Sequence, residues 1–338
     1  MKDFIIRRFL LGLIVLLGVT VVTFTIARVV PSEPAARWVG PRATAEQIEQ
    51  AREHLGLNRP LPVQYWTYMR GLVSGDWGVS IRTHQPVLRD IGSYLPASLE
   101  LCIIGMLIAI VIGLPLGVLS SVHQNTIFDH AIRVVSIAAV SLPTFWLGMI
   151  LQLIFFKELG LFPLSGRVSM EARWLMPFDS VTGFNLVDSL ISGNFSAFAD
   201  VARHLVLPAV TLAAYPIGLI TRMIRSSMLE VLGEEHITVG YAYGLPQRLM
   251  VYRYALRNAL APTLTVIALS FAYSLAGTFL IEAIFSWPGL GYYAAQSIIT
   301  VDYPAIMGVT ILVAGLYVFL NILVDITQAF LDPRIKMG

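Results

Sequence analysis

The sequence predicts an all-α polytopic membrane protein with six transmembrane helices, a cytoplasmic helical hairpin and a structured extracytoplasmic segment after the first span. Hydrophobic residues make up 56% of the chain and charged residues only 13%, whereas soluble domains carry about 25% charged residues. The mean hydropathy is +0.73. Long apolar stretches alternate with polar segments, and lipid requires each spanning backbone to satisfy its own hydrogen bonds, which favours helices.

Six stretches reach the length of about 20 residues that a helix needs to cross a hydrocarbon core. They contain uninterrupted runs without Asp, Glu, Lys or Arg, such as Phe9–Ala27 and Leu101–Phe128. A membrane barrel would show short alternating strands instead. The predicted spans are 9–30, 99–122, 134–157, 205–227, 263–286 and 305–330.

These spans divide the chain into three parts. Residues 1–30 form a cytoplasmic tip and the first transmembrane helix, 31–98 form an extracytoplasmic segment, and 99–338 form a five-helix core. The core contains a polar hairpin at 229–262 and an extracytoplasmic loop at 158–204.

Positive charge sets the expected orientation. Lys2, Arg7 and Arg8 precede the first span and place the N-terminus in the cytoplasm. Six crossings return the C-terminus to the same side, where Arg334 and Lys336 lie. The apolar run of the first span exceeds that of a cleaved signal peptide, so this helix is expected to be retained. The expected cytoplasmic loops are 123–133, 228–262 and 331–338.

The segment 31–98 has local structure of its own. Thr44 and Gln47 have the spacing of a capping box at a helix N-terminus. Gly56 then ends the helix and Pro60 follows. This segment and the loop 158–204 could dock a soluble partner or simply cap the bundle, and the sequence favours neither. The apolar face of the expected helix consists of Ile48, Ala51 and Leu55.

Prolines and glycines occur inside the expected spans. The prolines should kink these helices without ending them, because neighbouring helices satisfy the freed carbonyl groups. Gly113 and Gly117 form a small-residue face that permits close helix approach. Such features suit a pathway that changes shape but are also common in static bundles. The prolines concerned are Pro115, Pro143, Pro208, Pro216 and Pro262.

Several classes of function are disfavoured. None of the three lysines follows a glycine, so the chain has no P-loop for ATP. Cys102 is the single cysteine, and no His/Cys cluster suggests a metal site or a nucleophile–base pair of an intramembrane enzyme. A net charge of +2 argues against nucleic acid.

Ionisable residues in the spans are few and lie near predicted span ends. Interfacial or capping roles are therefore favoured over an ion relay, which disfavours an ion-coupled carrier or a channel and indicates an external energy source. These residues are Glu100, His204, Arg222, Glu282 and Asp325.

The polar stretch Glu230–Pro262 is the candidate functional site. Its first helix is expected over 229–243, with Glu230, Glu234 and Glu235 near the positive end of the helix dipole. Gly244 is expected in a left-handed conformation at the helix C-terminus, and Pro246 cannot continue the helix.

The second helix of this hairpin is expected to carry Arg253 and Arg257 one turn apart on one face. Between the two helices the residues 241–245 should be exposed, with aromatic rings suited to a partner's cleft. The alternative is an ordinary cytoplasmic loop whose tyrosines lie at the lipid interface.

The hairpin resembles the EAA signature of permease subunits of bacterial ABC importers. The order of acidic residues, small-x-x-x-Gly-Leu and Leu-Arg-Asn-Ala-Leu-x-Pro is similar in both. Over essentially the whole chain, the sequence resembles the first (B-type) permease subunit of the dipeptide/oligopeptide/nickel importer family. Further matching stretches are Arg7–Leu10, Arg28–Pro31, Leu55–Pro62, Gly75–Ser80, Ser141–Trp146, His204–Ala209, Phe285–Gly291 and Leu331–Arg334.

The resemblance implies that the hairpin is a coupling helix seated in a groove of an ATPase subunit. Gly244 is then the signature glycine and Ala242 one of its small residues. Gly240, Tyr241 and Tyr243 depart from positions that are often small or basic in the signature. The contact should therefore be more aromatic and less salt-sensitive than usual.

The residues expected to contact the ATPase share the first helix and the turn after it: Glu234, Glu235, Gly240, Tyr241, Ala242, Tyr243, Gly244 and Leu245. The residues expected to support the hairpin are Arg248, Arg253, Arg257, Asn258 and Pro262.

The resemblance also implies a non-catalytic subunit of the cytoplasmic membrane that forms half of a translocation pathway for peptides. The implied partners are a related permease, two ATP-binding subunits, an extracytoplasmic substrate-binding protein and the lipid bilayer. ATP and Mg would bind to the partner subunits, and this chain would bind no cofactor. Alternative substrates in the same family are nickel chelates, glutathione and sugars.

Overall fold

The computed structural model describes all residues except 1, 30–33, 41, 55 and 332–338. The described residues form helices, and the one β-bridge among them joins Val79 and Pro86. The helices are α1 (Lys2–Val29), α2 (Pro34–Val39), α3 (Ala45–His54), α4 (Leu61–Ser74), α5 (Val87–Val122), α6 (Ile127–Ser141), α7 (Thr144–Leu151), η1 (Gln152–Glu158), α8 (Met170–Leu175), α9 (Asn185–Ile191), α10 (Phe195–Leu232), α11 (Glu235–Ala242), α12 (Gln247–Leu249), η2 (Met250–Ala255), α13 (Leu256–Gly277), α14 (Phe279–Ile284), α15 (Leu290–Thr300) and α16 (Tyr303–Leu331).

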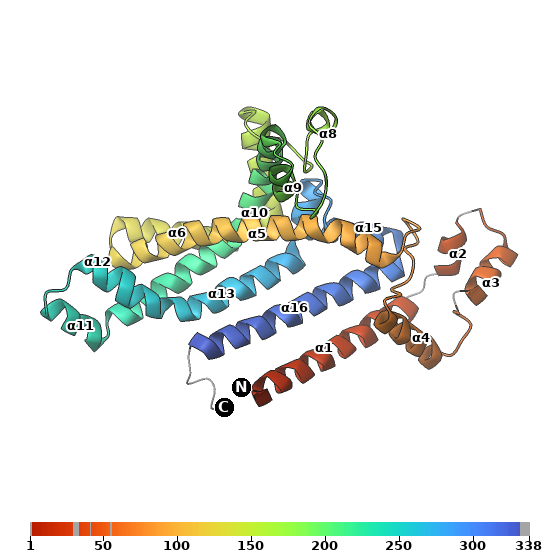
Figure 1. The fold of residues 1–338 in the computed structure, drawn as a ribbon, viewed down its shortest axis with the longest axis horizontal. Helices are drawn as coiled ribbons and strands as arrows, with labels where there is room; N and C mark the ends of the chain where they lie inside the picture. The colour runs from red at the N-terminus through yellow and green to blue at the C-terminus, as the bar shows by residue number, and fades with distance from the viewer. Residues whose placement is uncertain (1, 30–33, 41, 55, 332–338) are drawn as a thin grey trace.

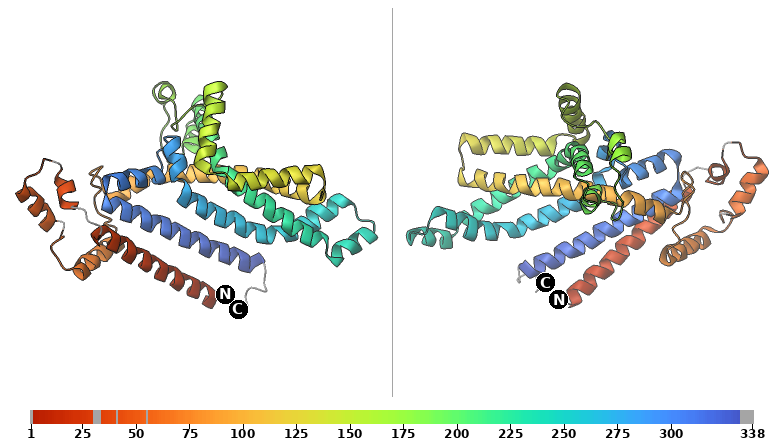
Figure 2. Two further views of the ribbon diagram at one scale, coloured as in Figure 1. Left: turned by 180° about the vertical axis from the view of Figure 1, so that it is seen from behind. Right: turned by 45° about the horizontal axis from the view of Figure 1, so that its top comes forward.

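The long helices form the body of the molecule. Five spans are long and apolar enough to cross a membrane, and a bent pair makes a sixth if it counts as one span. In packing order, α1 contacts α16, α16 contacts α13, α13 contacts α10, and α10 contacts α5 (Figure 1). The all-helical fold with up to six spans is confirmed. The described ends of α1 and α16 that lead to the two termini lie close together in every view (Figure 2).

The third predicted span, 134–157, is broken. Helix α6 ends at Ser141 and α7 begins at Thr144, with a bend of 106° between the two halves of the pair. Leu142 is extended, at ψ 134°, because the ring of Pro143 disfavours a helical conformation in the preceding residue. The expectation that Pro143 only kinks a helix was wrong. The other four prolines do lie inside continuous helices: Pro115, Pro208, Pro216 and Pro262.

The fifth predicted span, 263–286, differs at both ends. The helical stretch begins at Gln247, and α13 ends at Gly277, so the helix is interrupted at Thr278 before the short helix α14. Glu282 lies on α14 and is completely buried. Its carboxylate accepts hydrogen bonds from Ser98 Oγ and from Tyr292 N in the first turn of α15, at 2.5 and 2.8 Å. Glu282 therefore caps α15, which agrees with the expected capping role, although it lies on α14 beyond the end of the span.

Glycines on α5 permit the close approach of α10. A Cβ added to Gly113 would lie 3.2 Å from the carbonyl oxygen of Ile217, and one added to Gly117 would lie 2.7 Å from that of Thr221. Thr221 Oγ1 also donates to the carbonyl of Gly113 at 3.2 Å. The predicted small-residue face is thus a tight helix–helix contact, as in other membrane bundles.

The capping box of α3 is present as predicted. Thr44 N donates to Gln47 Oε1 at 2.9 Å, and Gln47 N donates to Thr44 Oγ1 at 3.3 Å. Gly56 has a φ of +64° just past the helix, which favours glycine. Ala51 is buried on this helix. Leu55 and the predicted cytoplasmic charges Arg334 and Lys336 lie outside the described residues.

The loop 158–204 contains α8 and α9 and is attached to α5. Glu100 is buried inside α5, not at its end, because this helix begins at Val87. Its carboxylate pairs with Arg167 Nη2 at 2.5 Å and accepts from Leu186 N at 2.8 Å. The guanidinium of Arg167 lies over the ring of Trp287, 5.5 Å from its centroid. Glu100 thus anchors the loop to the bundle.

Within this loop, Asp188 stabilises the turn that precedes α9. Burial opposes ionisation of Asp188, but hydrogen bonds from the hydroxyl and amide of Thr182 and from the Gly183 amide lower its pKa. A lowered pKa means that the ionised carboxylate stabilises the fold at neutral pH, and this contribution is lost as the pH falls through the folded-state pKa.

Candidate functional site

The hairpin at 229–262 begins with a break that the sequence analysis did not predict. Helix α10 continues to Leu232, and α11 begins only at Glu235, so the expected single helix over 229–243 was wrong. Glu234 is extended, at ψ 151°, and occupies the N-cap position of α11. Glu234 and Glu235 therefore do lie at the positive end of a helix dipole, whereas Glu230 lies in the last turn of α10.

Gly244 ends α11 in the conformation that was predicted. Its φ is +78°, in the left-handed region that favours glycine. Gly244 N donates to the carbonyl of Tyr241 at 2.9 Å, and Leu245 N donates to the carbonyl of Gly240 at 3.1 Å. This pair of hydrogen bonds is a Schellman motif, and it reverses the chain direction at the tip of the hairpin.

After Leu245, Pro246 precedes a second helix that continues into the fifth span through a π-helical turn at Met250–Ala255. Arg253 and Arg257 are both exposed, as is Asn258. Within the described part of the chain, Arg253 and Arg257 form no ion pair with a carboxylate of this protein. Arg248 and Pro262 lie on the same helical stretch and are also exposed.

The interior of the hairpin packs against the ends of two spans. Ile237 from α11 and Met250 from η2 are almost completely buried, and they form one cluster with Ile224 and Met228 of α10 and Val118 of α5. The packing fixes the hairpin to the ends of α10 and α5, and close-packed side chains of this kind can transmit displacement.

Gly240 belongs to this interior and not to the exposed surface. A Cβ added there would lie 2.5 Å from Met250 Cε and 3.6 Å from Leu245 Cδ1. The glycine therefore permits α11 to lie close to the following helix. Its expected role in contacting a partner stays a prediction, and its position favours a role in shaping the hairpin.

The outer surface of the hairpin tip is aromatic. Tyr243 is 84% exposed and Tyr241 is 42% exposed. Ala242, Gly244 and Leu245 lie between and beside them and are also exposed. We call residues 241–245 the tip. Large rings that are held on a rigid turn lose little conformational entropy on binding, and such rings anchor protein interfaces.

A buried ion pair next to the hairpin was not anticipated. Asp129 of α6 is completely buried, and both of its oxygens accept from Arg225 of α10, at 2.7 Å from Nε and 2.8 Å from Nη2. Ser120 Oγ and Asn125 N also donate to this carboxylate, at 2.5 and 3.0 Å. The pair joins the loop between α5 and α6 to the helix that carries the hairpin. The sequence offers two signals for this pair: Asp129 lies in the expected loop 123–133, and Arg225 lies near the end of the expected span 205–227.

Three other ionisable residues that were assigned to span ends have varied surroundings. Asp325 pairs with Arg8 at 3.1 Å, which joins the end of α16 to the start of α1. His204 Nδ1 lies 3.5 Å from Asp200 Oδ2. Arg222 is exposed. The described residues contain no group of three or more His, Cys, Asp or Glu side chains that could hold a metal ion.

Comparison with known proteins covers nearly the whole chain. Residues 113–337 match the family described as binding-protein-dependent transport system inner membrane component, and residues 1–102 match the N-terminal part of the same kind of membrane component. The chain is 43% identical to the probable D,D-dipeptide transport system permease protein DdpB of Escherichia coli, over 99% of this chain and 98% of the relative.

Two further relatives show the same full-length similarity. The dipeptide transport system permease protein DppB of Alkalihalophilus pseudofirmus is 42% identical over 99% of this chain and 100% of the relative. The oligopeptide transport system permease protein AppB of Bacillus subtilis is 35% identical over the same shares. The chain therefore belongs to the family of inner membrane components of binding-protein-dependent transport systems, which are non-catalytic permease subunits.

Proposed function

We propose that the chain is one of two related permease subunits of an ATP-driven importer for peptides. The full-length relatives are named as dipeptide, D,D-dipeptide and oligopeptide permeases, which supports short peptides as the substrate class. Nickel chelates, glutathione and sugars are the alternative substrates.

The exposed aromatic side chains of the tip are the main support for a role in coupling to an ATP-binding subunit. It projects Tyr241 and Tyr243 from a turn whose interior is packed against α5 and α10. In the proposed mechanism, an ATP-binding subunit holds the tip, closes on ATP and Mg, and moves the hairpin. The two spans then transmit that displacement to the translocation pathway.

A docking role for the loop 158–204 is the second part of the proposal. Helix α8 buries Ala172 but leaves Met170, Trp174 and Leu175 about 70% exposed. A cluster of large apolar side chains outside the spans is typical of an interaction surface. We propose that the extracytoplasmic binding protein docks on this surface. Arg167 and Glu100, at the base of the loop, instead hold the loop on the helical bundle. The hairpin and both termini are then cytoplasmic.

Uptake into proteoliposomes tests the proposed function. The chain is purified with its co-purifying subunits and reconstituted, and radiolabelled di- and oligopeptides are added outside with the binding protein. We expect uptake that requires ATP in the lumen, because this chain has no P-loop of its own. Uptake driven by an ion gradient in the absence of ATP, or a purified chain with no nucleotide-binding subunit, would contradict the importer assignment.

A further inference from the structure

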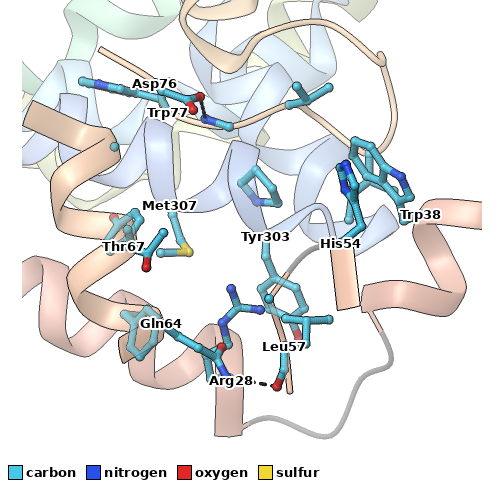
Figure 3. A pocket seen from close by; sticks show the side chains of 18 of the residues that line it. Arg28, Trp38, His54, Leu57, Gln64, Thr67, Asp76, Trp77, Tyr303 and Met307 are labelled. Carbon is cyan, nitrogen blue, oxygen red and sulfur yellow. Dashed lines mark hydrogen bonds between the residues drawn. The ribbon is translucent and has the colours of Figure 1, made fainter. Parts of the chain in front are cut away.

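A cavity of about 450 Å³ lies where α1, α4 and the start of α16 meet (Figure 3). Helix α4 and the hairpin helices α11 and α12 lie at opposite ends of the molecule (Figure 1). Its walls are held by packing between these helices: Phe24, Tyr303 and Met307 form one buried cluster with Tyr65 and Tyr68 of α4. Tyr65 also shares a 2.8 Å hydrogen bond with Thr20 of α1. The cavity is thus part of a built contact, and its volume is in the range of small-molecule sites.

Arg28 brings a positive charge into this cavity. Its guanidinium lies over the ring of Phe24, 5.7 Å from the centroid. Arg28 Nε is buried and makes no hydrogen bond within the described residues. A buried donor without a partner is costly, so a ligand that accepts from it gains free energy.

Gln64 supplies the complementary group at the same end of the cavity, where Figure 3 places it beside Arg28. Its Nε2 is used, because it donates to the carbonyls of Leu57 and Arg59 at 3.1 and 2.7 Å. Its buried Oε1 makes no hydrogen bond within the described residues. The site therefore suits a ligand with an anionic acceptor and a neighbouring hydroxyl or ammonium donor.

The position of the cavity relative to the membrane indicates the source of such a ligand. Arg28 lies in the last turn of α1, which ends at Val29, and this places its guanidinium at the boundary of the hydrocarbon core. Helix α4 exposes Leu61, Trp66 and Val73. An amphipathic helix with an exposed tryptophan is typical of the membrane interface. Phosphodiester headgroups of lipids lie at this level.

We propose that the cavity binds the headgroup of a phospholipid, with the phosphodiester at Arg28 and a headgroup hydroxyl or ammonium at Gln64 Oε1. The apolar walls formed by Phe24 and Met307 receive the start of an acyl chain. The bound lipid fixes α4 against the first span. This inference concerns lipid binding and is independent of the transported substrate.

Native mass spectrometry of the delipidated, purified complex tests the proposal with short-chain phosphatidylglycerol as the probe. We expect Arg28→Gln to weaken binding of one lipid equivalent by about tenfold, the effect of losing one charge-assisted hydrogen bond. Arg70→Gln is the matched control, because Arg70 is exposed on α4 and does not line the cavity. Arg70→Gln should bind as the unmodified protein does.

Two further arms separate the possible outcomes. Inorganic phosphate should bind much more weakly than the lipid. Equal binding of both would contradict the lipid site and indicate a site for free anions. Arg28→Lys keeps the charge and should bind better than Arg28→Gln, which separates ligand binding from a folding defect. Unchanged lipid binding in Arg28→Gln would overturn the proposal.

Discussion

Gly244→Asp is expected to abolish coupled transport while the spans stay inserted. Gly244 has a φ of +78°, at which any L side chain strains the backbone, but a Cβ added there meets nothing within 4 Å, so no steric clash opposes it. The new carboxylate would lie at the negative end of the α11 dipole and at the centre of the aromatic tip. An unpaired charge buried in an interface costs several kcal/mol, which corresponds to a hundredfold or greater loss of subunit affinity.

Gly244→Asn is the matched control for this prediction. Asparagine also tolerates the left-handed conformation, and it has nearly the same size without the charge. We expect Gly244→Asn to retain most of the peptide uptake and Gly244→Asp to lose it. Uptake and ATP hydrolysis are measured together in proteoliposomes. Normal uptake by Gly244→Asp would contradict the assignment of the tip as the coupling contact.

Asp129→Asn is expected to destabilise the protein more than any other single change considered for this end of the bundle. It leaves Arg225, whose side chain is only 17% exposed, with no carboxylate partner in place of two hydrogen bonds of 2.7 and 2.8 Å. Removing one partner of a buried ion pair costs about 3–5 kcal/mol. The thermal midpoint of the purified complex should fall by several degrees, and ATP hydrolysis should become less coupled to uptake.

Arg133→Gln provides the control for the buried pair. Arg133 also lies near Asp129, but at 3.8 Å and with 37% of its side chain exposed. Exposed ion pairs contribute little to stability, so this variant should shift the midpoint by a degree or two at most. The double change Asp129→Asn with Arg225→Gln should recover part of the lost stability, because it removes the unpaired charge. Equal midpoints for Asp129→Asn and Arg133→Gln would contradict the structural role of the pair.

Much of the fold was predictable because it follows from local rules. Apolar length located the spans, and the capping box at Thr44 and Gln47 formed as its spacing indicated. Gly244 adopted the left-handed conformation, because a glycine followed closely by proline is a strong helix-end signal. Gly113 and Gly117 mark a close helix contact. Each of these features depends on residues that are near in sequence or on one helix face.

The features that the sequence did not predict depend on tertiary contacts. The expectation that prolines kink membrane helices without ending them holds for Pro115 inside α5. It fails at Pro143, which precedes a new helix. The sequence gives no strong signal for the break at Gly233 and Glu234, because acidic residues occur both at the N-cap and within the first turn of a helix. Asp129 and Arg225 are 96 residues apart, so their pairing cannot be read from spacing. The inward position of Gly240 depends on Met250 in the same way.

Cross-linking from residue 243 tests whether the tip contacts an ATP-binding subunit and receives force from it. Cys102 is the single native cysteine and is buried, so Tyr243→Cys adds one accessible thiol. With a short thiol–amine cross-linker, the account predicts a product that joins this chain to the ATP-binding subunit and whose yield changes when ATP is added. Trp66→Cys, on α4, should give no such product. Absence of the product from Tyr243→Cys in a complex that still transports peptide would contradict the account.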